Sequence, residues 1–150
     1  MEKNKYYVPC VEEFHVGFEY EHQMKKYGGL TGERHSKLRG VISREWVNQD
    51  LDWEYTLEYM KTLIDSGTIR VKHLDREDIE SLGFEIPQGG LDYIYKKVVG
   101  DIYYILITNP EYPTKIEIRC SHPSWAYGSF LGTIKNKSEL KRVLTQIGII

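Results

Sequence analysis

Apolar and polar residues alternate most clearly between positions 11 and 22. The apolar residues at every second position are Phe14, Val16, Phe18 and Tyr20. The polar residues between them include Glu13, His15, Glu19 and Glu21. A period of two sends these sets to opposite faces of a β-strand. The pattern therefore predicts a strand over Val11–His22, with one face in a core and the other either solvated or at the floor of a site.

Two later segments have the three- and four-residue spacing of amphipathic helices. The middle helix is predicted to begin at Asp52 and to end at Gly67, an N-cap and a left-handed C′ residue. Its buried stripe consists of Trp53, Leu57, Met60 and Ile64. The C-terminal helix is predicted to begin at Asn136 and to end at Gly148, with a stripe of Leu140, Val143, Leu144 and Ile147. Exposure of this second stripe would cost about 1.5–3 kcal/mol per large side chain, so we expect it to pack across a sheet.

The remaining apolar segments predict strands separated by tight turns. They cover residues 38–47, 68–74, 91–99, 102–108, 115–120 and 130–134. Gly100–Asp101 fits a two-residue hairpin turn. Ile102–Thr108 is apolar on both faces, which places it centrally in a sheet. Together these elements predict an α+β fold in which residues 1–150 form a single domain. We expect one curved, mainly antiparallel sheet of five to seven strands, with the middle and C-terminal helices packed on one face.

Composition narrows the class of protein. With 41% hydrophobic and 28% charged residues, the 150-residue chain is typical of a globular domain. A net charge of −2 argues against general nucleic-acid binding, and two cysteines are too few for a disulfide scaffold. The first residues lack the apolar core of a signal peptide, and the longest apolar run is far shorter than the roughly 20 residues of a membrane span. We therefore expect a cytoplasmic protein that does not bind a membrane.

A basic, glycine-containing segment follows the first predicted strand. Between residues 25 and 44 there are six basic residues and one acidic residue. Glycines among cations let backbone N–H groups approach an anion such as phosphate, although the residue order is not that of a nucleotide P-loop. A flexible, solvated loop is the alternative. The candidate ligand-binding residues are Lys37, Arg39 and Arg44 for the anion, with Trp46 or Tyr127 to stack on a nucleobase.

Signatures of catalysis are few. Cys120 falls on the apolar side of its strand, which favours a packed thiol over a nucleophile, and no nucleophile-elbow motif is present. His15, Glu19 and Glu21 project from one face of the first predicted strand. Two of them, with a ligand from another strand, are candidate metal ligands. Because no established ligand spacing is present, a solvated surface is the alternative, and no cofactor is expected.

Three segments together resemble known sequences. They are EEFHVGFEYE near the start, RVKHLDREDIESLGF in the middle and GTIKNKSELKRVLTQIGI at the end. In this order they resemble small uncharacterised proteins of Bacteroidetes genomes and of their phages and mobile elements. The resemblance implies no activity and no site residue. It implies a context in which small cytosolic proteins bind host factors or defence signals.

These observations favour a non-enzymatic binding protein over an enzyme. Its partner is expected to be a host protein or a small anionic, nucleotide-like ligand, for example in counter-defence. The alternative is a metal-dependent hydrolase that acts on a phosphate-containing substrate and uses His15, Glu19 and Glu21. Both a monomer and a homo-oligomer are compatible with the sequence.

Replacing Arg39 and Arg44 together by Glu tests the anionic-ligand hypothesis. The double variant is expected to fold normally and to lose ligand binding, because two positive charges that neutralise phosphate become negative. Mass spectrometry of small molecules released from protein incubated in cell lysate measures retention. Unchanged ligand retention by the double variant would rule out this version of the function.

Overall fold

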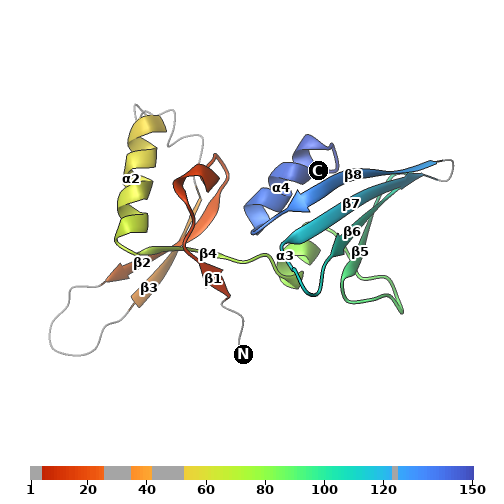
Figure 1. Cartoon of the computed structure of the whole chain (residues 1–150), viewed down its shortest axis with the longest axis horizontal. Helices are drawn as coiled ribbons and strands as arrows, with labels where there is room; N and C mark the ends of the chain where they lie inside the picture. The colour runs from red at the N-terminus through yellow and green to blue at the C-terminus, as the bar shows by residue number, and fades with distance from the viewer. Residues whose placement is uncertain (1–4, 26–34, 42–52, 123–124) are drawn as a thin grey trace. The chain divides into compact units, whose positions relative to one another are not determined.

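Residues 5–25, 35–41, 53–122 and 125–150 are described by the computed structural model (Figure 1). For residues 23–25, 35–41, 53–56, 122 and 125–127 the backbone alone is described. The chain divides into two compact units, Met1–His73 and Leu74–Ile150. Each unit has its own sheet and its own hydrophobic core. The predicted α+β class is therefore confirmed, and each unit combines helix and sheet.

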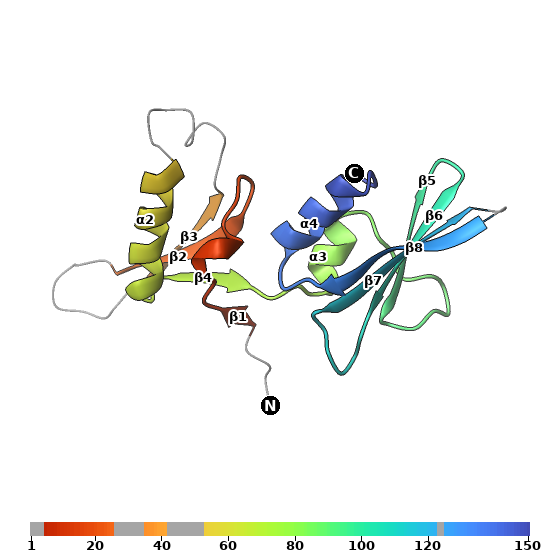
Figure 2. The same ribbon diagram turned by 45° about the horizontal axis from the view of Figure 1, so that its top comes forward.

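The first unit places one α-helix against an antiparallel sheet with the strand order β1-β4-β2-β3 (Figures 1 and 2). Its elements are β1 (Tyr6–Tyr7), the 3-10 helix η1 (Val11–Glu13), β2 (Glu19–Lys25), β3 (His35–Val41), α2 (Trp53–Asp65) and β4 (Ile69–Lys72). The buried residues of its core are Phe14, Phe18, Tyr20, Met60, Leu63, Ile69 and Val71. The side chains of this core therefore come from β2, α2, β4 and the segment between η1 and β2.

The predicted strand over Val11–His22 is wrong in its first half. Val11–Glu13 forms η1, a turn follows, and β2 begins only at Glu19. Gly17 has a φ of +88°, a left-handed conformation that glycine adopts without strain and that breaks the extended chain. The turn still buries Phe14 and Phe18, whose ring centroids lie 4.8 Å apart, but it leaves Val16 42% exposed. Apolar residues four positions apart share one side of a tight turn as well as of a strand, which explains the error.

Helix α2 is confirmed over most of the predicted range. Met60 is buried and Leu57 and Ile64 are half-buried against the same core, as the stripe predicts, and Leu63 beside the stripe is buried too. The predicted N-cap Asp52 lies outside the described residues. At the other end Gly67 has a φ of +64°, and the backbone N–H of Thr68 donates to the Leu63 carbonyl at 3.1 Å. These bonds satisfy the last turn and redirect the chain into β4.

The second unit is a four-stranded antiparallel meander with two helices on one face (Figures 1 and 2). Its elements are α3 (Arg76–Ser81), β5 (Ile94–Val99), β6 (Ile102–Thr108), β7 (Lys115–His122), β8 (Trp125–Thr133) and α4 (Lys137–Gln146). Sequence neighbours pair throughout, in the order β5-β6-β7-β8. Leu106, Ile116 and Ile118 of the sheet are fully buried against Leu140 and Leu144 of α4. The central position predicted for Ile102–Thr108 is therefore confirmed.

Helix α4 follows its sequence signals closely. The Asn136 side chain accepts a hydrogen bond from the backbone N–H of Glu139 at 3.0 Å, which caps the helix. After the last turn Gly148 has a φ of +74°, and the backbone N–H of Ile149 donates to the Leu144 carbonyl at 2.8 Å. Ile149 is buried, which completes the hydrophobic contact typical of this C-terminal ending.

The single curved sheet predicted from the sequence is replaced by two separate sheets. The middle helix α2 belongs to the first core and the C-terminal helix α4 to the second, so they do not cover one common face. Alternation along a strand shows which side chains are buried, but it does not specify which strands are hydrogen-bonded neighbours. The assignment of residues 1–150 to a single cooperative domain stays a prediction. No helix among the described residues is long and apolar enough to cross a membrane.

Candidate functional site

The candidate ligand-binding residues predicted from the sequence fall on strands of both units or outside the described residues. Lys37 and Arg39 lie on β3 and pair through the backbone with Gln23 and Glu21 of β2. Tyr127 lies on β8, in the other unit, opposite Cys120. The side chains of the three candidates are not described, and Arg44 and Trp46 lie outside the described residues. This site stays a prediction, although Lys37 is now placed in a strand rather than in the loop predicted for it.

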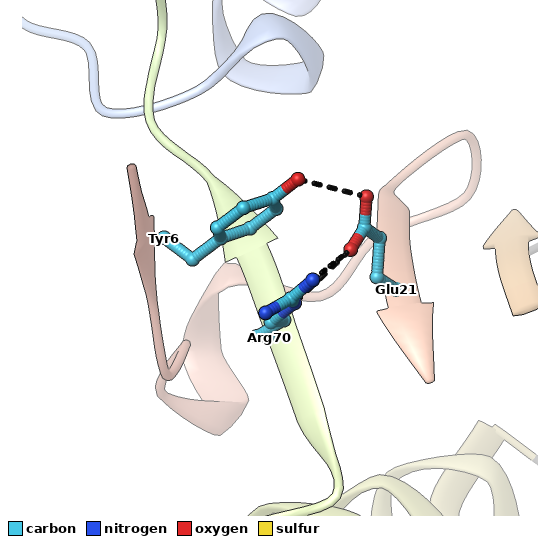
Figure 3. Close-up of polar contacts among 3 residues, drawn as sticks. All are labelled: Tyr6, Glu21 and Arg70. Carbon is cyan, nitrogen blue, oxygen red and sulfur yellow. Dashed lines mark hydrogen bonds and ion pairs between the residues drawn. The ribbon is translucent and has the colours of Figure 1, made fainter. Parts of the chain in front are cut away.

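Glu21, one of the candidate metal ligands, is held by residues of two other strands (Figure 3). Arg70 of β4 donates from Nε and Nη2 to Glu21 Oε2 at 3.0 and 2.8 Å. Tyr6 of β1 donates its hydroxyl to Glu21 Oε1 at 3.2 Å, and the Arg70 guanidinium lies 3.8 Å from the centroid of the Tyr6 ring. Both carboxylate oxygens are therefore engaged, and Glu21 ties β1, β4 and β2 together.

His15 does not share a strand face with Glu19 and Glu21, because it lies in the turn that precedes β2. Its Nδ1 is 2.9 Å from the Val16 carbonyl oxygen, and its ring meets the Phe18 ring edge-on at 5.6 Å. Within the described ranges, no three His, Cys, Asp or Glu side chains are grouped so that they could hold a metal ion. The geometry on which the three metal candidates rested, one polar strand face, is therefore wrong.

The second sheet has a side facing away from α3 and α4, which we call the outer face. Side chains alternate along each strand, so the residues between the buried ones point to this side. Its described side chains are Ile94, Lys96 and Val98 of β5, Tyr103, Ile105 and Ile107 of β6, Lys115, Glu117, Arg119 and Ser121 of β7, and Leu131 and Thr133 of β8. Six of these twelve are apolar or aromatic. A solvated face of an antiparallel sheet is usually polar, so this composition is unusual.

Three apolar side chains of the outer face are exposed, beside the exposed cations Lys96, Lys115 and Arg119. Leu131 is 81% exposed, Val98 55% and Tyr103 38%. In the strand register Ile94, Ile107, Glu117 and Leu131 share one row across the sheet, so Glu117 separates Leu131 from the apolar residues of β6. Val98 lies directly opposite Tyr103 in another row. The apolar side chains of β5 and β6 are therefore neighbours, and exposed apolar surface of this kind marks an interaction site.

The charged groups of the outer face are largely compensated. Arg119 donates from Nε to Glu117 Oε1 at 2.6 Å and from Nη2 to Oε2 at 3.1 Å. The hydrogen bond from Arg119 lowers the pKa of Glu117, so this carboxylate is ionised at neutral pH. Lys96 Nζ lies 4.2 Å from the centroid of the Tyr103 ring. Lys115 Nζ lies 4.8 Å from the centroid of the Tyr112 ring. The face thus presents apolar surface with an internal ion pair and two cations on aromatic rings.

A hollow of about 460 Å³ lies beside β5, at the margin of the same sheet. It is lined by Gly83, Glu85, Ile86, Pro87, Gln88, Lys96, Lys97 and Val98. The Lys97 ammonium donates to the Leu82 carbonyl at 2.8 Å and lies over the Phe84 ring. Glu85 exchanges backbone hydrogen bonds with Lys96 at 2.9 and 2.7 Å. These contacts attach the segment of residues 82–88 to β5. The hollow lies where this segment meets the strand, and this packing explains it.

The sequence carries a signal for the outer face, although that signal does not by itself indicate a site. The run Ile102–Thr108 is apolar on both faces, which correctly predicts an internal strand. Its second apolar face supplies Tyr103, Ile105 and Ile107 to the outer face. Comparison with models of protein families, with curated proteins and with solved structures finds no match. The assignment of a function therefore depends on the physical properties of this surface.

Proposed function

We propose that this chain is a non-enzymatic binding protein that recognises a partner protein through the outer face of the second sheet. The observation that supports this proposal is the exposure of Leu131, Val98 and Tyr103 on one sheet face. Leaving such side chains in water forgoes about 1.5–3 kcal/mol for each one that a partner would fully bury. Tyrosine is also among the residues that most often supply binding energy at protein interfaces.

The chemistry of the expected partner follows from the groups on this face. The partner would offer a flat or slightly convex apolar surface to a sheet. Because Glu117 is already paired with Arg119, a partner carboxylate would meet Lys96 or the open side of Arg119. The identity of the partner as a host protein, and a role in counter-defence, stay predictions from the resemblance. Binding of a small anionic ligand through Lys37, Arg39 and Arg44 stays a separate prediction.

Replacing Tyr103 by Glu tests this function. We expect the affinity for the partner protein to fall at least about tenfold, because the change removes buried aromatic surface and places a charge in an apolar contact. The matched control is Tyr112→Glu, in the turn between β6 and β7, where the tyrosine is 55% exposed. Both variants should keep the wild-type free energy of unfolding within about 0.5 kcal/mol.

The measurement is capture from cell lysate on immobilised wild-type protein and on each variant, followed by titration of the captured partner. The proposal expects a partner that wild type and Tyr112→Glu retain and that Tyr103→Glu loses. A partner retained equally by all three proteins would place binding elsewhere and would contradict the proposal.

A further inference from the structure

Strand β8 forms one margin of the second sheet. It runs for nine residues, Trp125–Thr133, and it pairs with β7 alone among the described residues. Within the described ranges, the backbone of this strand makes no hydrogen bond outside its pairing with β7. The margin of a sheet presents a row of backbone N–H and C=O groups, and this row is a template for another extended chain.

The opposite margin of the same sheet is protected. Glu85 exchanges two backbone hydrogen bonds with Lys96 and so covers part of β5. Strand β5 also carries Lys96 and Lys97. Lysine side chains and a covering segment are two of the devices by which proteins prevent pairing at sheet edges.

Strand β8 lacks most of these devices. Its sequence, WAYGSFLGT, contains no charged residue and no proline. It has one irregularity, a register shift between Ile118 and Arg119 of β7 that leaves Ser129 as an extra residue on β8. This bulge interrupts the edge at one point but leaves Phe130–Thr133 regular, and that segment includes Leu131, which is 81% exposed.

We infer that β8 pairs with β8 of a second copy of this chain, antiparallel and about a two-fold axis. The occupant must supply backbone donors and acceptors in an extended conformation, and β8 supplies its own complement in that arrangement. Because the strand is uncharged, the axis brings no like charges opposite one another. The exposed Leu131 side chain lies beside the new strand pair and loses water contact there.

This pairing goes beyond the proposed recognition of a partner protein. It uses the backbone of β8, whereas the outer face binds through side chains. It would join two four-stranded sheets into one continuous sheet with two outer faces side by side. A partner carrying two binding sites would then bind with avidity.

Sedimentation velocity of the whole chain over a range of concentrations tests the inference. Wild type is expected to shift from 17.6 kDa toward twice that mass as the concentration rises. Leu131→Lys and, separately, Thr133→Lys are expected to weaken dimerisation at least about tenfold, because a lysine at a sheet edge opposes pairing. The control Tyr112→Lys adds the same charge away from β8 and should dimerise as wild type does.

Two further measurements test whether the dimer forms through the edge strand β8. Amide hydrogen exchange should show protection of residues 128–133 that increases with concentration in wild type. Tyr103→Lys changes the outer face but not the edge, so it should retain the dimer even where it loses the partner protein. Failure of dimerisation and failure of partner recognition are thereby distinguishable.

Three outcomes would overturn the inference. Wild type that stays monomeric up to about 1 mM has no useful self-affinity. A dimer that Tyr103→Lys abolishes and both β8 variants retain would be formed by stacked outer faces. Protection of residues 128–133 that is equal at every concentration would mean that another segment of the same chain covers the edge.

Discussion

Replacing Phe18 by Ala is expected to unfold the first unit while the second unit stays folded. Phe18 is fully buried in the first core, and loss of a buried phenylalanine costs about 3–5 kcal/mol. That is a large part of the roughly 5–15 kcal/mol by which a whole domain is stable. The buried residues of the two cores form separate clusters, so the lost packing is confined to one of them.

Hydrogen exchange resolved by peptide is the measurement for this variant. Amides of β2, α2 and β4 should lose protection in Phe18→Ala, whereas amides of β6 and β7 should keep it. Val16→Ala is the matched control, because Val16 lies two positions away and is 42% exposed, so a change within about 0.5 kcal/mol is expected. Simultaneous loss of protection in both units would instead establish one cooperative domain over residues 1–150, as the sequence predicts.

The same substitution at two leucines of the second unit should have very different effects. Leu144→Ala is expected to lower the free energy of unfolding by about 2–5 kcal/mol, because Leu144 is fully buried beneath the sheet and its removal leaves a cavity. Leu131→Ala is expected to change it by no more than about 0.5 kcal/mol, because that side chain is 81% exposed.

Chemical denaturation monitored by circular dichroism measures both effects. The midpoint should fall sharply for Leu144→Ala and stay close to wild type for Leu131→Ala. If Leu131→Ala were as destabilising as Leu144→Ala, Leu131 would be part of a core, and the outer face would not be available for binding.

The sequence predicts structure well where the signals are local and complete. For α4, Asn136, the apolar stripe and Gly148 determine the start, the buried side and the end, and the structure confirms each. For residues 11–18 two local structures fit the same pattern. Gly17 favours the turn, and alternation alone does not reveal that.

Strand pairing was not predictable in the same way. Alternation separates the two faces of a strand, but the neighbour of each strand is decided by contacts between residues far apart in the chain. Strand β8 begins at Trp125, five residues before the predicted start at Phe130. Glycine and proline favour turns, so Gly128 and the nearby Pro123 argue locally against a strand here. Gly128 nevertheless pairs with Arg119 within the sheet.

Only part of the candidate site can be predicted from the sequence. The sequence shows that Ile102–Thr108 is apolar on both faces, and this pattern predicts the central position of β6. The row formed by Ile94, Ile107, Glu117 and Leu131 depends on the register of four strands, which no local pattern specifies. The role of Glu21 is equally hidden, because Arg70 and Tyr6 lie 49 and 15 positions away.

The pairing of β1 with β4 has a consequence during synthesis. Tyr6 pairs with Lys72, so the first sheet cannot be completed until β4 has left the ribosome. At about 5–20 residues per second, β1 waits roughly 3–13 s for its neighbour. Throughout this interval the nascent N-terminal segment is accessible to chaperones and proteases, whereas each strand of the second unit can pair with the one made just before it.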